Sequence, residues 1–448
     1  MAKVAGDIQG IAKIPELKRR ILITFLFLAV YRLGVHVPVP GVRSWLFGQW
    51  VEQGQDSILG LVNMFSGGAL KQMSVFALGI MPYISASIIL QLLTVVVPTL
   101  ERLSKEGEQG RRVITQYTRY GTVLLSVIQG FGIAVGLEGL KVTVSDPGML
   151  QSMGLAVATE IPVVLAGGFG FKLMTVLSLT AGTAFIMWLG EQITERGIGN
   201  GISLIIFAGI VVGIPSAVLA EFARGVGAGG GLLMLIFIVA VTFFVVWVER
   251  SQRRIPVQYA KRVVGRRVYG GQSTHLPLKL NTAGVIPPIF ASSLLMFPMT
   301  VGQFVDHPWV DTIRGLLNPG SLVYSIVYVA LIIFFCYFYT AIQFNPNDVA
   351  DNMKKNGGYI PGIRPGQRTA EYIDKVLSRL TFWGGIYVSL VCLLPTLLRR
   401  EGVSFFFGGT SLLIVVGVAL DTVSQIETHL IARNYEGLTA KRRIRGRR

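Results

Sequence analysis

The stretch GIMPYISAS, residues 79–87, has a counterpart later in the same chain, GVIPPIFAS at residues 284–292. The two share the pattern G-x-x-P-x-I-x-A-S. A second pair, GISLIIFAG at 201–209 and GTSLLIVVG at 409–417, has nearly the same offset, 208 residues against 205. Short matches among Gly, Ala, Ser and Ile are common in membrane helices, but two matches with nearly equal offsets indicate an internal repeat.

Apolar stretches of membrane-spanning length run through the whole chain. Hydrophobic residues make up 52% of the 448 positions and charged residues 15%, which is typical of a protein that lies in lipid. A helix needs about 20 apolar residues to cross a bilayer. The stretches lie at 21–35, 75–98, 115–137, 170–190, 201–222, 231–249, 282–301, 321–343, 378–398 and 410–432. We therefore predict an all-α polytopic membrane protein with ten transmembrane helices.

Lysine and arginine gather in alternate loops between these stretches. They precede the first stretch and follow the second, sixth, eighth and tenth, and the chain carries a net charge of +17. Since basic loops stay on the cytoplasmic side, both termini are predicted to be cytoplasmic. Arg399 and Arg400 depart from this rule on a short external turn, and residues 153–170 are predicted to form an external loop. The polar, lysine-containing leader argues against a cleaved signal peptide.

A glycine-rich stretch divides the predicted spans into two sets of five. An odd number of spans in each set means that the second set enters the membrane from the opposite side, so we predict two inverted five-helix halves around a central pore. The predicted parts are an N-terminal half at 1–223, a flexible external connection at 224–231, a C-terminal half at 232–433 with cytoplasmic loops at 250–280 and 344–377, and a basic cytoplasmic tail at 434–448.

The repeat also indicates where the functional axis lies. Pro82 and Pro287 each remove a backbone donor from a predicted spanning helix, and paired interruptions of this kind mark the axis of repeat membrane proteins. An ionisable side chain at mid-membrane costs about 3 kcal/mol and is kept only for function. Charged residues lie toward the ends of the spans, as Arg32 and Asp421 do, or in the cytoplasmic turn after the fourth span, as Glu191 does. A proton or ion relay is therefore not expected.

Branched aliphatic side chains occupy the repeated segments instead. They are Ile80, Ile84, Ile202, Ile206, Ile289 and Ile414. Together they can form a hydrophobic constriction, which excludes water and ions by dewetting. Composition alone favours a plainer alternative, in which these isoleucines pack against neighbouring helices or face lipid.

Five longer motifs carry a resemblance to a known family. They are NMFSGGA at 63–69, LGIMPYISASII at 78–89, WLGEQITERGIGNG at 188–201, QSTHLPLK at 272–279 and IPGIRPG at 360–366. In this order the motifs resemble the SecY family, the channel subunits of the protein-secretion translocon, over essentially the whole chain. The resemblance implies two five-helix halves around an hourglass pore, through which unfolded polypeptides cross the membrane or leave sideways into lipid.

The resemblance assigns roles to these sequence features. It makes the six isoleucines a pore ring, an apolar gasket that fits around any side chain. Residues 56–74 resemble the family's plug, a short external helix, for which the alternative is a fixed interfacial helix. The plug residues are Asn63, Met64, Phe65, Ser66, Gly67 and Gly68.

The second and seventh spans resemble the two sides of a lateral gate. The gate residues are Pro82, Ser87, Gln91, Asn281, Pro287 and Ile289. A polar contact between Gln91 and Asn281 is worth about 1 kcal/mol in lipid, enough to bias the gate toward closure while leaving opening possible.

The basic loops contain more charge than topology requires. By resemblance they dock the ribosome or the SecA motor ATPase, through Arg253, Arg254, Arg266, Arg267 and Arg364. Guanidinium groups suit the phosphates of ribosomal RNA because of their bidentate geometry and because binding releases counterions. The other partners that the resemblance implies, at the cytoplasmic (inner) membrane, are SecE and SecG subunits, ribosomal proteins, signal peptides, nascent polypeptides and membrane lipids.

Two other classes of function remain as alternatives. An inverted repeat with broken helices also fits a secondary transporter of a small solute. An intramembrane enzyme needs a nucleophile with a base, or paired aspartates, within the spans, and the sequence shows neither, so no catalytic residue is expected. No histidine or cysteine cluster has the spacing of metal ligands, so no metal or other cofactor is expected.

Overall fold

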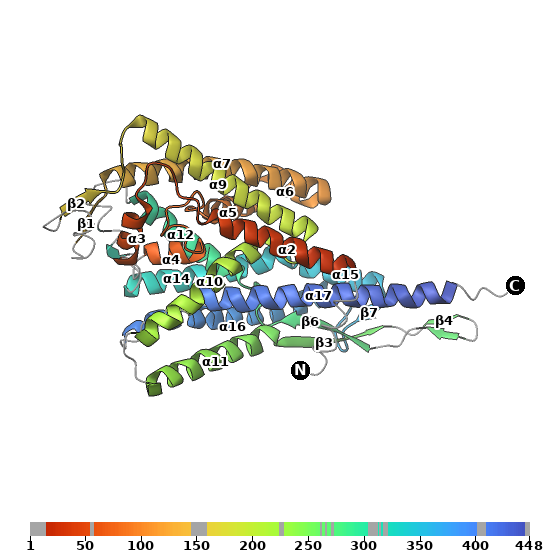
Figure 1. Ribbon diagram of the computed structural model, residues 1–448. Coiled ribbons are helices and arrows are strands. Elements are labelled where there is room, and N and C mark those ends of the chain that lie inside the picture. Colours follow the sequence, from red (N-terminus) through yellow and green to blue (C-terminus); the bar gives the residue numbers. More distant parts are fainter. Residues whose placement is uncertain are drawn as a thin grey trace. The chain divides into compact units, whose positions relative to one another are not determined.

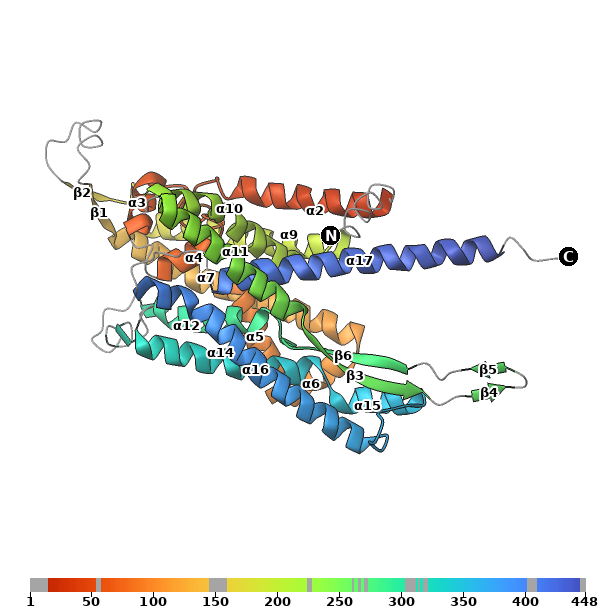
Figure 2. The ribbon, with the colours of Figure 1, turned by 90° about the horizontal axis from the view of Figure 1, so that it is seen from below.

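The computed structural model describes residues 15–53, 58–144, 159–223, 228–259, 262–264, 267–269, 273–302, 312, 315–316, 321–400 and 409–443. Figures 1 and 2 show the ribbon, coloured along the sequence. The chain divides into two compact units. The first unit comprises residues 1–218, 293–321 and 418–448, and the second comprises 219–292 and 322–417.

Helices follow the predicted apolar stretches. The first unit contains α2 (Pro15–Gly34), α5 (Met81–Val96), α7 (Glu108–Gly139), α9 (Phe169–Arg196) and most of α10 (Gly201–Ala223). The second unit contains α11 (Ala228–Arg250), α14 (Leu322–Gln343) and α16 (Gln367–Arg400). Two more helices, α12 (Ile286–Gly302) and α17 (Thr410–Arg443), contribute residues to both units. Among the described residues, each predicted span therefore overlaps one helix.

Several of these helices are long and apolar enough to cross a membrane alone. In the described part of the chain they number five and lie at Glu108–Gly139, Phe169–Arg196, Leu322–Lys355, Gln367–Thr396 and Thr410–Ile431. A sixth candidate is the pair α5 and α6 (Pro98–Lys105), which meet at 100°. The bend falls at Val97, whose extended ψ of 113° is the conformation favoured before proline. The chain is a multi-pass helical membrane protein, as predicted.

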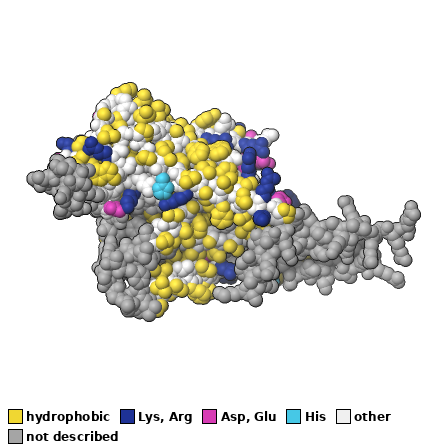
Figure 3. All heavy atoms as spheres, in the orientation of Figure 1, with side chains coloured by type: hydrophobic (Ala, Val, Ile, Leu, Met, Phe, Trp, Pro, Cys, Tyr) yellow, Lys and Arg dark blue, Asp and Glu magenta, His cyan; other side chains and the backbone are white. Residues whose placement is uncertain are grey.

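Apolar side chains cover much of the described surface. Figure 3 shows hydrophobic side chains spread over the visible face, with charged side chains in small groups. Phe131 on α7 is 53% exposed, and Phe169 and Leu177 on α9 are 79% and 59% exposed. Extended apolar surface of this kind is rare on water-soluble proteins, so these helices present a surface suited to lipid.

The helices of the first unit pack as a layer with a small core at one end. In this layer α7 packs against α5 and α9, and α9 also packs against α2 (Figure 1). The core lies beside α3 (Ser44–Gln53) and the antiparallel strands β1 (Lys141–Val144) and β2 (Thr159–Pro162). It includes the buried residues Leu46, Met73, Val142 and Leu179. β2 lies within the predicted loop at 153–170, of which 153–158 fall outside the described residues.

The second unit contains a β-ribbon where the sequence analysis predicts only a loop. β3 (Gln252–Tyr259) pairs with β6 (Ser273–Lys279) and with β7 (Gly358–Tyr359), and the hairpin of β4 (Arg262–Val264) and β5 (Arg267–Tyr269) lies beyond the ribbon's end (Figure 2). Ile255, Val257 and Leu278 are buried with Met353 of α15 (Pro346–Lys355) and Ile373 of α16. The alternation of buried and exposed residues around Ile255 is the strand signal that the loop assignment missed.

Several helices extend past the predicted boundaries. α11 begins at Ala228, inside the glycine-rich stretch, and residues 224–227 fall outside the described residues. α16 begins at Gln367, inside the predicted loop at 344–377. α17 continues to Arg443, through the predicted start of the tail. A helix satisfies its own backbone hydrogen bonds, so it can continue beyond the apolar stretch, and hydropathy alone does not locate its ends.

Candidate functional site

The two repeated segments start helices in the same way. Gly79 has a φ of +56° and precedes α5, which begins at Met81, while Gly284 has a φ of +68° and precedes α12. Positive φ favours glycine, which explains the shared residue. Pro82 and Pro287 lie in the first helical turn, where a missing N–H costs no helical hydrogen bond. The prolines therefore begin the helices and do not interrupt them as expected, and the common backbone conformation supports the repeat.

Turns occupy the chain between α4 (Ile58–Phe65) and α5. The stretch predicted as a span from residue 75 is therefore helical only from Met81. The Asn63 carbonyl oxygen accepts from Gly68 N at 2.9 Å and from Ser66 Oγ at 3.1 Å, and Asn63 Oδ1 accepts from Lys71 N at 2.9 Å. We call residues 63–74 the turn segment. Its internal hydrogen bonds give it a defined shape of its own.

Two neighbouring residues of α2 hold the turn segment. The Tyr31 hydroxyl donates to the Ser66 carbonyl at 3.0 Å, and Arg32 Nη1 donates to the Gly67 carbonyl at 2.6 Å. Tyr31 is buried and Arg32 is half-buried. The sequence analysis noted Arg32 only as a charge near the end of a span, and Tyr31 was not singled out.

The turn segment also lies directly against α10. A Cβ atom built on Gly67 would lie 2.8 Å from Gly209 Cα, and one built on Gly209 would lie 3.1 Å from Gly67 Cα. Two backbones meet at this point with no side chain between them. Phe65 and Ser66 are buried beside the contact, whereas Asn63, Met64 and Gly68 are half-buried. Of the predicted plug, residues 56 and 57 fall outside the described residues.

The far end of the turn segment is anchored through its backbone. Val39 N donates to the Met73 carbonyl at 2.9 Å, and Val75 N donates to the Val37 carbonyl at 2.9 Å. Met73 is fully buried and has a φ of +43°, the single positive φ of a non-glycine residue among the described residues. Such a conformation persists only where the surrounding contacts enforce it. The chain is therefore firmly fixed where the turn segment ends.

The six isoleucines divide between the two units. Ile80, Ile84, Ile202 and Ile206 belong to the first unit, and Ile289 and Ile414 belong to the second. Ile84 N donates to the Ile80 carbonyl at 3.1 Å, which places these two residues one helical turn apart. All six are buried except Ile202, which is half-buried. Their closure into a ring stays a prediction, because the members belong to both units.

The helices assigned to the lateral gate meet within the first unit. Ser293 Oγ of α12 donates to Met81 Sδ of α5 at 3.9 Å, a contact that the sequence analysis did not foresee. Pro82 is buried and Ser87 is half-buried on α5. Gln91 Nε2 donates to Ser87 Oγ at 3.3 Å, and the buried Gln91 Oε1 has no partner among the described residues.

The gate residues of the second unit form a local polar cluster. Asn281 is 4% exposed, and its Nδ2 donates to Glu249 Oε1 at 2.8 Å and to the Gly284 carbonyl at 3.1 Å. Asn281 Oδ1 accepts from Gly284 N at 3.1 Å. Asn281 thus fixes the turn before α12, and Pro287 and Ile289 are buried in that helix. Glu249, at the end of α11, is a partner that hydropathy gave no reason to select.

The turn at residues 197–201 joins several helices of the first unit. Ile198 N donates to Thr24 Oγ1 of α2 at 3.1 Å, and Gly199 N donates to Gln425 Oε1 of α17 at 2.9 Å. Asn200 Oδ1 accepts from Ile202 N at 3.1 Å and so caps α10. The end of the WLGEQITERGIGNG motif is therefore a turn that connects α2, α10 and α17. The two side chains that bind its backbone, Thr24 and Gln425, lie far from it in the sequence.

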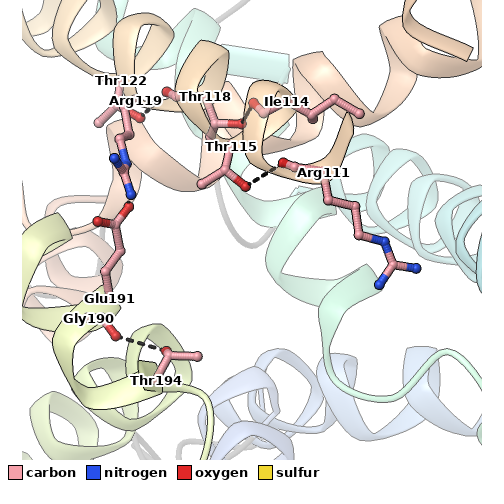
Figure 4. A network of polar contacts seen from close by, with 9 residues as sticks. All are labelled: Arg111, Ile114, Thr115, Thr118, Arg119, Thr122, Gly190, Glu191 and Thr194. Carbon is pink, nitrogen blue, oxygen red and sulfur yellow. Dashed lines mark hydrogen bonds and ion pairs between the residues drawn. The ribbon is translucent and has the colours of Figure 1, made fainter. Parts of the chain in front are cut away.

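One ion pair links two helices of the first unit. Arg119 Nε of α7 donates to Glu191 Oε1 of α9 at 2.7 Å (Figure 4). Glu191 was expected in the turn after the fourth span, but it lies on α9 with 18% of its side chain exposed. Figure 4 shows the two side chains pointing toward each other, while Arg111 on α7 points elsewhere. No group of His, Cys, Asp and Glu that could hold a metal ion occurs among the described residues.

The predicted docking arginines lie on the second unit. Arg253 and Arg254 are exposed on β3. Arg364 is exposed between two prolines, and its carbonyl accepts from Thr369 Oγ1 at 3.0 Å. Arg266 falls outside the described residues, and the backbone of Arg267 lies in β5 opposite Val264. Arg253, Arg254 and Arg364 are thus exposed on the second unit.

Comparison with known proteins places the chain in a family. It matches the family model described as SecY over residues 74–423. It is 52% identical to the protein translocase subunit SecY of Escherichia coli strain K12 over 461 residues, which covers 100% of this chain and 99% of that protein.

The fold is also similar to solved channel structures. One concerns the plug domain of the SecY protein, which stabilises the closed state of that translocation channel and maintains a membrane seal. Its TM-score with this chain is 0.61, with 18% identity over 94% of this chain and 96% of that chain. Another is Sec61 in the canine ribosome-channel complex from the endoplasmic reticulum, with a TM-score of 0.58 and 16% identity over the same shares of the two chains. The family model, the relative and the shared fold agree: this chain belongs to the SecY family.

Proposed function

We propose that this chain is the protein-conducting channel of the general secretory pathway. It passes unfolded polypeptides across the cytoplasmic membrane, with both termini in the cytoplasm, and releases transmembrane segments sideways into lipid. The observation that carries the proposal is the turn segment, a separately folded piece seated against α2 and α10 immediately before the repeated helix start. A transporter or an enzyme has no need of such a removable piece.

The plug of this channel is formed by residues 56–74, and the turn segment is the part of it that lies against α2 and α10. The similar SecY protein has a plug domain that stabilises the closed state of its channel. In this chain the corresponding residues, Asn63 to Gly68, make their hydrogen bonds to one another and to only a few outside groups. A piece with its own internal bonds can leave its seat without unfolding.

The six isoleucines form the seal around a passing polypeptide. Their side chains offer no hydrogen bonds, so the seal does not favour any particular sequence in the translocated chain. An apolar constriction of this type stays dry when it is empty, which blocks ions. The burial of Ile80, Ile84 and Ile206 in the first unit and of Ile289 and Ile414 in the second supports this role over that of lipid-facing residues.

The gate lies between α5 and α12. The Ser293 to Met81 contact is a weak link between the middle of α12 and the start of α5. Gln91 Oε1 is buried without a described partner, so this amide is ready to accept from a group on an entering segment or on the facing helix. On the α12 side of the gate, the hydrogen bond from Asn281 to Glu249 helps to fix the turn that precedes this helix.

The accessory partners are SecE and SecG in the membrane, with the ribosome and the SecA motor on the cytoplasmic side. The fold of Sec61, which is bound to a ribosome in its own complex, supports a ribosome-facing surface in this chain. The exposed Arg253 and Arg254 on β3 and Arg364 on its proline-flanked loop are the contacts that we assign to this surface.

The experiment that tests the function is crosslinking to a stalled substrate. A secretory polypeptide is arrested in native membranes, and photoreactive probes are placed at Ile84 and at Ile289. We expect both probes to crosslink to the polypeptide. A probe at Leu124, 63% exposed on α7, is the control and should crosslink to lipid only. Absence of crosslinks at both isoleucines, together with uptake of a small solute, would instead identify a secondary transporter.

Reversing the charge on β3 should weaken ribosome binding. The Arg253→Glu, Arg254→Glu double variant removes two guanidinium groups that we assign to RNA phosphates, so the slope of log affinity against log salt should fall by about 1 for each phosphate that is no longer neutralised. Co-sedimentation of ribosomes with purified complex over a salt series measures this change. Lys141→Glu, on β1 of the first unit, is a matched charge reversal and should leave the affinity unaltered. Equal affinities of the double variant and the unmodified protein at low salt would remove β3 from the docking surface.

A further inference from the structure

We propose that Tyr31 and Arg32 form a latch that keeps the turn segment in its seat, and that release of this latch is the step that opens the channel to a polypeptide. The inference rests on the proposed channel function and names the residues that regulate it. Tyr31 and Arg32 are consecutive on α2, and they donate to the consecutive carbonyl groups of Ser66 and Gly67.

Arg32 has an unusual place for a charged residue. It lies toward the end of the predicted first span, an apolar stretch in which an unpaired charge is disfavoured. Within the described part of the chain no carboxylate lies within ion-pair distance of Arg32, and its one hydrogen bond goes to Gly67. A bond at 2.6 Å from a guanidinium group is charge-assisted and stronger than a neutral bond. The turn segment therefore supplies the hydrogen-bond acceptor for the Arg32 guanidinium group.

The bonds of the turn segment differ at its two ends. At its end, the Met73 carbonyl accepts from Val39 N, and Val75, which directly follows the segment, donates to the Val37 carbonyl. Near its start, the described bonds to the helices come from the side chains of Tyr31 and Arg32. An ion pair between Lys71 and Glu52 of α3 is exposed, so it contributes little. The start of the segment can consequently swing away about its anchored end once the two side-chain bonds break.

The nature of the acceptors makes the latch reversible. Backbone carbonyls of the turn segment that lose Tyr31 and Arg32 can be solvated by water outside the membrane. The two donors left behind can bind other carbonyl oxygens, and an extended polypeptide presents such oxygens whatever its sequence. An ion pair with a carboxylate would lack this interchangeability, since few residues of a passing chain could replace it.

Removing the latch should make the idle channel leak. In the complete translocon reconstituted into planar bilayers, we expect Arg32→Met to raise the resting ion conductance several-fold, Tyr31→Phe to raise it less, and Arg32→Lys to restore part of the seal. Arg43→Met is the matched control, because Arg43 also donates to a backbone carbonyl, that of Pro162 at 3.1 Å, but lies outside the turn segment. The control should conduct like the unmodified protein.

A second measurement separates the latch from general damage. With a stalled polypeptide in the pore, the latch variants should conduct like the unmodified protein, because the segment has already left its seat. If Arg32→Met fails to accumulate, Tyr31→Phe decides, since it loses only one hydroxyl. Resting conductance equal to that of the unmodified protein in the accumulating variants would overturn the latch. The proposed channel function would still stand if the stalled polypeptide crosslinks at Ile84, and it would fall separately if that crosslink is missing.

Discussion

Gly209→Val is expected to raise the resting ion conductance of the channel by roughly tenfold or more. The new Cβ would lie 3.1 Å from Gly67 Cα and 3.2 Å from Gly67 N, and the two methyl groups would come closer still. Overpacking of this kind costs about 1–3 kcal/mol, and 1.4 kcal/mol is a tenfold change in a population. The turn segment, which is the more easily displaced partner, should therefore leave its seat on α10. Conductance of the translocon in planar bilayers measures the effect.

The same helix provides the control. Gly213 lies one turn beyond Gly209 on α10, and a Cβ there would lie within 4 Å of none of the neighbouring atoms that the structure describes. Gly213→Val should therefore leave the resting conductance unaltered, although both variants introduce the same side chain into the same helix. If Gly209→Val also conducts like the unmodified protein, the turn segment does not seal the channel.

Gly182→Ala is expected to remove most of the protein from the membrane. Gly182 lies where α9 crosses the chain ahead of α5, and a Cβ there would lie 2.0 Å from the Val75 carbonyl oxygen. Neither backbone can yield locally, because Val75 N is itself bonded to the Val37 carbonyl. A cost of about 3 kcal/mol is a large part of the roughly 5–15 kcal/mol that stabilises a typical domain.

Steady-state abundance and the midpoint of thermal unfolding in detergent report on this substitution. Gly170→Ala, near the start of the same helix, introduces the same methyl group into open space. It should be neutral or slightly stabilising, because alanine restricts the unfolded chain more than glycine does. Normal abundance and an unchanged midpoint for Gly182→Ala would mean that α9 and residue 75 lie farther apart than the described contact.

The positions of the helices could be predicted from the sequence because lipid makes hydropathy decisive. Each predicted span overlaps a helix among the described residues. Helix ends were predicted less well, and α5 shows why. Residues 75–80 are as apolar as the helix that follows, but Gly79 with its positive φ holds them in turns. Hydropathy reports burial from water and says nothing about backbone conformation.

The β-ribbon shows a second limit. The basic residues of 250–280 predicted a cytoplasmic loop and correctly identified the exposed arginines on β3. They did not reveal the core of Ile255, Val257 and Leu278, because these three residues are buried against α15 and α16, about 100 residues later in the chain. A short alternation becomes a strand only when another element covers its apolar face.

The functional residues divide along the same line. Sequence motifs selected the isoleucines and the plug residues, since these belong to continuous stretches with a recognisable pattern. Tyr31 and Arg32 belong to no such stretch, and Gly209 ends a repeated segment whose pattern gave no sign of its contact. Their importance comes from single contacts with Ser66 and Gly67, and a contact between distant residues leaves no periodic trace in the sequence.

The sequence by itself determined that the chain lies in a membrane, which stretches become helices, and that residues 79–87 and 284–292, at the starts of α5 and α12, share one pattern. The membrane location and the helices depend on local composition, because in lipid each helix must satisfy its own backbone. Only the tertiary structure decided that the repeated prolines begin helices and that the turn segment sits on α10 under the donors of α2. Helix starts and the position of the turn segment depend on contacts between segments that are far apart in the sequence, and these contacts form only in the folded protein.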